Sequence, residues 1–272
     1  MPVSHKVIAA AAMLLVGIAV LSSAQSVLDV PQAVAEAVVA VGMIAPDPGN
    51  SSGTTTERPA LISGSGFFVN KRGNVITALH VVRAAEASRD QMQGTDYRLF
   101  VGLRANSSFV PIAAEIVGID EAHDLALLRT KLPAKMAAVN PVKLSSVRPE
   151  DGALIEAAGL PGSTGLALVH NIGHLADKVL LKAAGNLIAK APAGVDVSRI
   201  SGMNEFYLAD AKADEGMSGG PVYLVDSGAV IGVVQGYTKD PRLAVIVPAR
   251  YVIKLLESNS IGYQEFLGDK PE

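Results

Sequence analysis

Three residues whose side chains can act together in nucleophilic catalysis follow one another along the chain in the order His80, Asp124 and Ser218. A serine hydroxyl becomes a nucleophile when a histidine removes its proton and an acid orients that histidine. Each residue alone has an ordinary structural explanation, such as a turn or a strand end. Because all three occur in suitable surroundings and in this order, the sequence favours a catalytic triad.

The serine lies in the run Gly216-Met-Ser-Gly-Gly-Pro221. Flanking glycines permit a tight bend and the close approach of a substrate, which an exposed nucleophile needs. The backbone N–H groups of Gly216 and Ser218 are therefore candidate donors to the oxyanion that forms when a carbonyl carbon is attacked.

The other two residues stand next to apolar runs that read as strands. His80 follows Val75-Ile-Thr-Ala-Leu79, and Asp124 precedes Leu125-Ala-Leu-Leu128. The end of a core strand holds an imidazole rigidly, as a general base requires. Asp124 would accept the N–H of His80 and so select its tautomer. The adjacent His123 is expected to face solvent.

Composition limits the class of protein. The chain has 272 residues, is 49% hydrophobic and carries a formal net charge of -3. It is long enough for a substantial core. No cluster of basic residues is present, which argues against nucleic acid as the main partner. Cysteine is absent, so disulfides and thiol catalysis are excluded.

The N-terminus is typical of an exported protein. A short, weakly basic start precedes an apolar run over residues 7–21, and small residues follow up to Ala24. We expect residues 1–24 to be a signal peptide, with an uncleaved membrane anchor as the alternative. Residues 25–36 would form a connector.

The rest of the chain favours β structure. From Gly64 onward, short apolar runs alternate with turn residues, which indicates an all-β sandwich or a pair of barrels. Only the end looks helical, from Pro248 to about Ser258. No internal repeat is visible. The runs expected to form strands include residues 37–41, 67–69, 75–77, 113–117, 125–128, 153–157, 222–225, 230–234 and 244–247.

These motifs resemble the HtrA/Deg branch of the trypsin-like serine proteases, over residues 37–258. The resemblance is carried by the stretch from Gly64 to His80, by Asp124-Leu-Ala-Leu-Leu-Arg129, by Ala158-Gly-Leu-Pro-Gly162 and by Asp210 to Pro221. It implies two six-stranded antiparallel β-barrels with a short C-terminal helix and the active site between the barrels. The protease domain would span residues 37–265, followed by a tail over residues 266–272.

The chain also departs from this family. Met217 replaces the usual Asn or Asp, which implies no activation through a new N-terminus, and Asp214-Glu215 replaces Asn-Pro. The segment from Thr238 to Arg242 is shorter than the family's usual specificity loop. Few residues follow the terminal helix, so the PDZ domain of many members is not expected. The resemblance suggests a trimer.

The substrate site can be outlined from the same comparison. A peptide would add as a strand to the edge Val233-Val234-Gln235. Its side chain before the cleaved bond would meet the segments around Lys212, Val233 and Val245, and the valines favour a small or medium apolar group. Lys212 could instead select an acidic side chain, although lysine stems readily reach solvent.

We therefore expect an exported serine endopeptidase, periplasmic or secreted, that cleaves unfolded or extended polypeptides. One role open to such an enzyme is protein quality control. Ser218 would be the nucleophile, His80 the base and Asp124 its orienting acid. This acyl-enzyme chemistry requires neither a metal nor an organic cofactor. His170 and His174 lack a third ligand for a metal site. The alternatives are a peptide-binding, chaperone-like protein without catalysis, and an esterase on the same fold.

Overall fold

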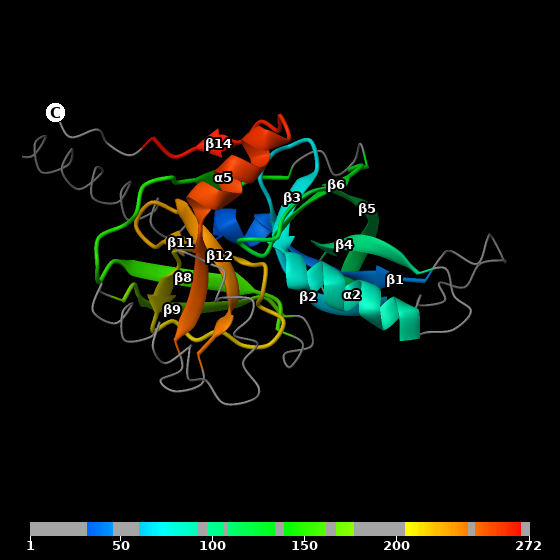
Figure 1. Cartoon of the computed structure of the whole chain (residues 1–272), viewed down its shortest axis with the longest axis horizontal. Coiled ribbons are helices and arrows are strands. Elements are labelled where there is room, and N and C mark those ends of the chain that lie inside the picture. Colours follow the sequence, from blue (N-terminus) through cyan, green and yellow to red (C-terminus); the bar gives the residue numbers. More distant parts are fainter. Residues whose placement is uncertain are drawn as a thin grey trace, which may run out of the picture.

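The structure, a computed structural model, describes residues 32–45, 60–91, 97–105, 108–133, 139–161, 167–176, 205–238 and 243–267. The predicted N-terminal segment over residues 1–24 lies outside these ranges. The described part of the chain forms two β units that lie side by side (Figure 1).

The first unit is a closed barrel in the order β1-β2-β3-β6-β5-β4, with neighbouring strands antiparallel. Its strands are β1 (Val38–Ile44), β2 (Ala60–Phe68), β3 (Asn74–Ala78), β4 (Arg98–Ala105), β5 (Ser108–Asp120) and β6 (Leu125–Thr130).

The second unit follows the path β10-β13-β12-β11-β8-β9, and its two ends are joined by an isolated bridge between Leu175 and Ala209. The predicted pair of six-stranded barrels with a C-terminal helix is thus confirmed, although only a bridge closes the second. Its strands are β8 (Leu154–Gly159), β9 (Val169–His174), β10 (Tyr207–Ala209), β11 (Pro221–Leu224), β12 (Val230–Tyr237) and β13 (Ala244–Pro248), with β7 (Lys143–Leu144) and β14 (Gln264–Glu265) attached to the β12 side.

Three apolar clusters hold this arrangement together. One fills the first barrel with residues such as Val75 and Leu128, and a second fills the other barrel with residues such as Ile155 and Ile246. The third joins side chains of both units, including Phe67 and Val233. Burial of this shared cluster holds the two barrels against each other, which a site built from both of them requires.

The C-terminal helix is found where it was predicted, as α5 (Ala249–Ser258). Its apolar residues Val252, Leu255 and Leu256 recur at helical spacing and pack into the shared cluster. Pro248 precedes its first turn, where a missing N–H costs nothing. Residues 32–37 are also helical, so the helix extends one residue past the predicted connector and the first strand begins at Val38 rather than Ala37.

A second long helix, α2 (Leu79–Gln91), was not expected, and the prediction that only the chain's end is helical was wrong. Val81 and Val82 read as the continuation of a strand because β-branched residues favour strands. In the structure both valines are buried and pack into the cluster that fills the first barrel.

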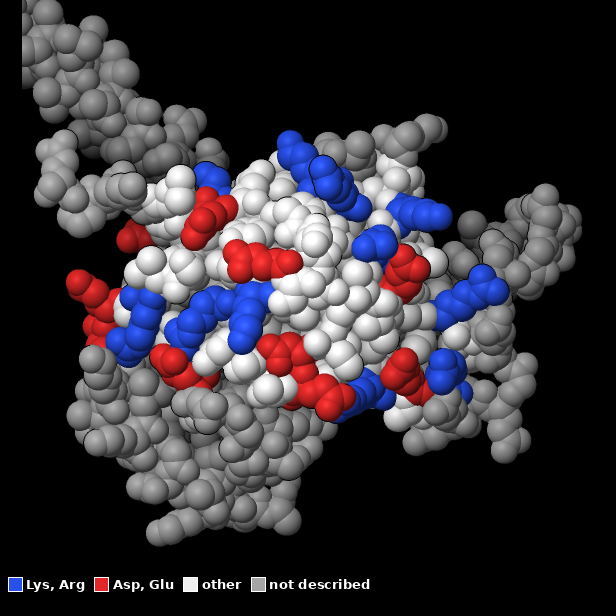
Figure 2. All heavy atoms as spheres, turned by 45° about the horizontal axis from the view of Figure 1, so that its top comes forward, with Lys and Arg blue, Asp and Glu red and all other residues white. Residues whose placement is uncertain are grey.

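Charges on the surface are mixed. Over the face that Figure 2 turns forward, acidic and basic side chains are interspersed. Among the described residues, no helix is both long and apolar enough to cross a bilayer.

Candidate active site

Strand pairing in the first barrel brings His80 and Asp124 together. His80 is the second residue of α2, directly after β3, and Asp124 is the residue before β6. Because β3 and β6 are antiparallel and Ala78 lies opposite Leu125, the end of one strand meets the start of the other. Residues 44 positions apart in the chain therefore become neighbours.

The Asp124 carboxylate holds His80 at two points. Its Oδ2 lies 2.6 Å from Nδ1 of the His80 ring, and its Oδ1 accepts the His80 backbone N–H at 2.8 Å. Both side chains are largely buried, with 14% of His80 and 10% of Asp124 exposed. The Asp124 backbone lies in the left-handed region at φ 52°, which Asp tolerates better than most residues. The pairing leaves the other ring nitrogen available for chemistry.

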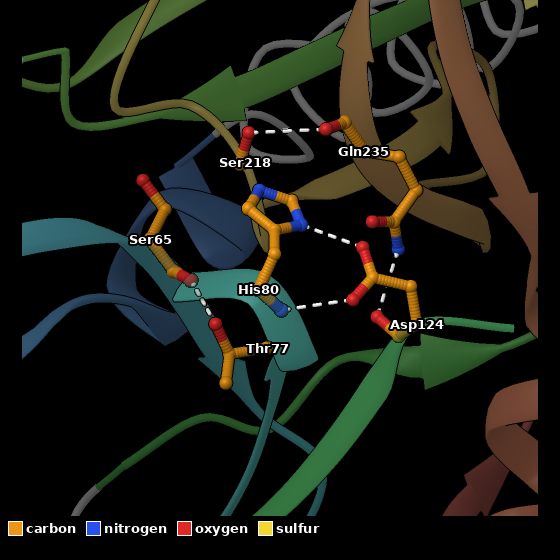
Figure 3. A network of polar contacts seen from close by, with 6 residues as sticks. All are labelled: Ser65, Thr77, His80, Asp124, Ser218 and Gln235. Atoms are coloured by element: carbon orange, nitrogen blue, oxygen red, sulfur yellow. Dashed lines mark hydrogen bonds and ion pairs between the residues drawn. The ribbon is translucent and has the colours of Figure 1, made fainter. Parts of the chain in front are cut away.

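Ser218 comes from the second barrel, in the turn that leads into β11. Figure 3 shows the second ring nitrogen of His80 turned toward the Ser218 side chain. In the described structure the Ser218 hydroxyl donates to the carbonyl oxygen of Gln235 at 3.2 Å. The three residues predicted to form a triad are thus brought to one place, from both barrels.

The turn around Ser218 contains the two backbone N–H groups predicted as oxyanion donors. Gly216 and Gly219 have φ values of 94° and 85°, which only glycine adopts readily. The N–H groups of Met217, Gly219 and Gly220 donate to carbonyl oxygens inside the protein. Within the described part of the chain, those of Gly216 and Ser218 donate to none, so both remain available to an oxyanion.

Gln235 lies on the strand expected to bind substrate, and it also contacts two residues of the proposed triad. Its carbonyl accepts the Ser218 hydroxyl, and its Nε2 donates to the carbonyl of Asp124 at 3.3 Å. Its Oε1 is buried and has no hydrogen-bond partner among the described atoms. Gln235 therefore connects Asp124 of the first barrel with Ser218 of the second (Figure 3). Sequence reasoning missed this contact, because no spacing rule links residues 111 positions apart.

Val233 and Val234 do not form a free edge for a substrate. Both are fully buried. Val233 pairs with Pro221 of β11, and the N–H and C=O of Val234 bond to Gly220 and Gly219. Strand β12 continues beside β13 to Tyr237 but beside β11 only to Val233. A substrate strand would therefore meet Gln235 and the residue after it, not the two valines.

Lys212 and Val245 also differ from the expected pocket walls. The Lys212 side chain is 63% exposed, and its Nζ lies 3.0 Å from Oδ2 of Asp214. This surface ion pair disfavours the alternative in which Lys212 selects an acidic side chain. Val245 is buried and packs with Ala176 and Leu208. Residues 239–242 of the short specificity segment lie outside the described residues.

His123 was expected to face solvent, and this expectation was wrong. Its side chain is only 16% exposed, and its Nδ1 lies 2.7 Å from Oδ2 of Asp120. Its ring stacks on Tyr251 of α5, with centroids 3.6 Å apart and planes 19° from parallel. The turn that carries Asp124 is therefore anchored to α5.

The two other histidines that the structure describes lie elsewhere. His170 contacts Glu156 at 2.6 Å, and His174 lies 3.6 Å from a carboxylate oxygen of Asp210. In the described ranges, no group of three or more potential ligands could hold a metal ion.

Sequence comparison agrees with this geometry. The profile of the trypsin-like peptidase domain matches residues 64–233, more than half of the chain and the part that contains His80, Asp124 and Ser218. The chain belongs to the trypsin-like peptidase family. This trypsin-like chain is 32% identical over 195 residues to the uncharacterized protein y4bJ of Sinorhizobium fredii, covering 70% of the chain.

Two further relatives are named proteases. The putative serine protease HhoA of Synechocystis is 28% identical and covers 65% of this trypsin-like chain, and serine protease HTRA1B of Danio rerio is 25% identical and covers 76%. The chain spans only 25%, 37% and 36% of the lengths of y4bJ, HhoA and HTRA1B.

Solved structures show the same fold. The HtrA-type protease AlgW with a decapeptide has a TM-score of 0.60 at 18% identity, covering 86% of this chain and 67% of its own. Deg5 has a TM-score of 0.57 at 22% identity, covering 84% and 90%. Together with HhoA and HTRA1B, these likenesses confirm the resemblance of this trypsin-like chain to the HtrA/Deg branch.

Proposed function

We propose that this chain is a serine endopeptidase that cleaves polypeptides through an acyl-enzyme intermediate, with Ser218, His80 and Asp124 as its catalytic residues. The observation that carries the proposal is the 2.6 Å pairing of His80 Nδ1 with Asp124 Oδ2, which leaves the other ring nitrogen turned toward Ser218. Membership of the trypsin-like peptidase family supports it.

Acylation begins when Ser218 Oγ attacks the carbonyl carbon of the peptide bond and Nε2 of His80 takes the hydroxyl proton. Asp124 accepts the Nδ1–H and stabilises the imidazolium that forms. The N–H groups of Gly216 and Ser218 bind the tetrahedral oxyanion. His80 then gives its proton to the leaving amine nitrogen, the C–N bond breaks, and the acyl group remains as an ester on Ser218.

Deacylation repeats these steps with water. His80 removes a proton from the water molecule, whose oxygen attacks the ester carbonyl. The ester C–O bond breaks, and His80 returns the proton to Ser218 Oγ. Water is the only co-substrate, so no metal or organic cofactor enters the reaction.

The proposed substrate is an extended or unfolded polypeptide. Main-chain hydrogen bonds to the end of a strand select extended backbone and are insensitive to side chains. In β12, Gln235 and Gly236 extend past the end of the pairing with β11, next to Ser218. A Cβ placed on Gly236 would have no atom within 4 Å, which supports space for a bound chain there.

We also propose that the protein is exported, either released or held by its N-terminal segment. The apolar run over residues 7–21 and the small residues before Ala24 support this. The domain layout remains that predicted from sequence, with a connector over residues 25–36, the protease unit over residues 37–265 and a tail over residues 266–272. Assembly into a trimer and a role in protein quality control rest on the resemblance to HtrA-type proteases.

The test uses the purified full-length chain and its Ser218→Ala variant, each incubated with an unfolded model polypeptide. New peptide ends are identified by mass spectrometry. Ends that appear only with Ser218 present establish the endopeptidase, and the residue before each cut defines the preferred side chain. If neither protein cuts but both hold the unfolded chain equally, the protease proposal fails and peptide binding without catalysis takes its place.

A further inference from the structure

Ser65 in β2 joins the first barrel to the turn that carries Ser218. This residue is fully buried. Its N–H donates to the carbonyl oxygen of Ser218 at 2.8 Å, and its hydroxyl donates to the carbonyl oxygen of Gly216 at 2.7 Å. The same hydroxyl accepts the N–H of Leu160 at 2.9 Å. Three hydrogen bonds of one residue thus cross from the first barrel to the second.

These bonds hold the two carbonyls next to the proposed oxyanion donors. The carbonyl of Met217, between them, accepts the N–H of Gly220 at 3.0 Å. All three successive carbonyls, from Gly216 to Ser218, are therefore fixed by hydrogen bonds inside the protein. Because each peptide group is planar, fixing the Met217 carbonyl also fixes the Ser218 N–H, and the bonds to the Gly216 and Ser218 carbonyls hold the peptide groups on either side of it.

Gly216 has a backbone conformation in this turn that benefits from an external restraint. At φ 94° it occupies a region that glycine reaches readily, but glycine reaches many other regions at a similar energy. A turn with such freedom would lose conformational entropy each time its N–H bound an oxyanion. The Ser65 hydroxyl removes this freedom by binding the Gly216 carbonyl.

We infer that Ser65 is a positioning residue, whose hydroxyl holds Gly216 so that the N–H groups of Gly216 and Ser218 are already oriented for the oxyanion. This inference rests on the proposed protease function and adds a residue of the first barrel to the machinery. Its effect is specific to the transition state, because the oxyanion forms only there.

The chemistry at this position favours a hydroxyl over other groups. The side chain must donate to one carbonyl and accept from one N–H at the same time, which a serine hydroxyl can do. Alanine would leave the partly buried Gly216 carbonyl and the buried Leu160 N–H without this partner. The turn also lies close to β2, since a Cβ on Gly219 would come within 2.1 Å of the Ser65 carbonyl oxygen.

The first readout is steady-state kinetics of the full-length chain, with a peptide taken from a mapped cut site. Ser65→Ala is expected to lower kcat about 10- to 100-fold with little change in KM, less than the roughly 100- to 1,000-fold loss typical of deleting an oxyanion donor. The matched control is Tyr223→Phe, which also removes a buried hydroxyl, but one that contacts Nδ1 of His170 at 3.2 Å and hydrogen-bonds Glu156, neither of which belongs to the proposed triad. It is expected to leave kcat unchanged.

The second readout does not require activity. Amide hydrogen exchange is measured at Met217 and Gly220, whose N–H groups donate within the turn to Asp214 and Met217. Ser65→Ala is expected to raise their exchange rates about tenfold or more relative to Tyr223→Phe, because the turn opens more often. Ser65→Cys, whose thiol is somewhat larger and forms only weak hydrogen bonds, provides a second variant with an intermediate effect if the alanine variant does not fold.

The outcomes separate this inference from the proposed function. If the wild-type chain cuts and Ser65→Ala retains its kcat, the inference is overturned and the protease stands. If the wild-type chain cuts nothing, the protease proposal fails, and exchange alone decides the role of Ser65. If the amides of Met217 and Gly220 exchange as slowly in Ser65→Ala as in Tyr223→Phe, the positioning role is overturned, whatever the kinetics show.

Discussion

Asp124 contacts His80 through both carboxylate oxygens: one lies 2.6 Å from Nδ1 of the ring, and the other accepts the His80 backbone N–H at 2.8 Å. The first contact selects the tautomer of the ring, and the second aligns the carboxylate with the first turn of α2. The Asp124 carbonyl is held as well, by Leu79 and Gln235. The acid is thus fixed on both its side chain and its backbone.

Replacing Asp124 by Asn is expected to preserve the fold and abolish most of the activity. The Asn amide favours the wrong tautomer of His80, so kcat should fall about 10⁴-fold. Steady-state kinetics on a mapped peptide measures the loss, and urea unfolding checks that the variant is folded. A folded Asp124→Asn protein with kcat within about tenfold of wild type would contradict the assigned role.

The stack between His123 and Tyr251 should matter for turnover. Tyr251→Leu removes the ring on which His123 rests and loosens the turn before Asp124, so kcat should fall about 10- to 100-fold through misplacement of the acid. Tyr251→Phe keeps the ring and serves as the control, with kcat close to wild type. Equal kcat values for the two variants would show that the stack does not position Asp124.

Met217 anchors the Ser218 turn through apolar burial. Its side chain is fully buried with Ala213 and Val222, and its sulfur lies 3.4 Å from the N–H of Asp214. Met217→Leu should cost less than about 1.5 kcal/mol in the free energy of unfolding. Met217→Asp should cost about 3–5 kcal/mol, because it buries an unpaired carboxylate.

Denaturant unfolding of both Met217 variants measures this difference. The result also bears on activation, since an Asp at this position in the wider trypsin class pairs with a new N-terminus. An Asp variant as stable as the Leu variant would mean that the site already holds a partner for the carboxylate, and the apolar anchor would be the wrong explanation.

Glu156 is expected to make folding sensitive to acid. Burial by itself raises the pKa of this carboxyl group, but hydrogen bonds from His170 and Tyr223 and the charge of His170 outweigh burial and hold the pKa of Glu156 below its ordinary value. Because the pKa of Glu156 is lower in the folded than in the unfolded state, its ionisation stabilises the fold. This contribution is fully present above the unfolded-state pKa of about 4.3 and is lost as the pH falls through the folded-state pKa.

The free energy of unfolding of wild type and Glu156→Gln should therefore differ by about 1–3 kcal/mol near neutral pH and converge as the pH falls toward about 3. The control is Glu115→Gln, at a largely exposed glutamate, with little effect at any pH. A gap between wild type and Glu156→Gln that stays constant on acidification would contradict this assignment.

The sequence allowed an all-β fold and the residues of the proposed triad to be predicted from local signals, whereas the choice of two barrels came from the resemblance to the HtrA/Deg branch. The glycines around Ser218 and the apolar runs beside His80 and Asp124 can each be read within a few residues. The helix α5 was also predictable, since Val252, Leu255 and Leu256 repeat at helical spacing after Pro248. The helix α2 was not, because its buried valines are equally compatible with a strand.

The contacts that sequence reasoning missed all depend on packing between distant segments. Gln235 reaches Asp124 across 111 positions, and Ser65 reaches Gly216 across 151. The substrate edge was placed too early in β12, because the turn at Gly219 and Gly220 occupies the main chain of Val234. The stacking of His123 on Tyr251 and the exposure of the Lys212 side chain could not be predicted from the residue types alone.

The most direct test of the central claim is the reaction of the full-length chain with diisopropyl fluorophosphate, followed by intact-mass and peptide-mass spectrometry. An activated Ser218 Oγ attacks phosphorus and expels fluoride, so we expect one diisopropyl phosphoryl group per chain, located on Ser218. His80→Ala and Ser218→Ala should remain unmodified. A folded wild-type chain that takes up no phosphoryl group, or takes it up at another residue, would contradict the assignment of Ser218 as the nucleophile.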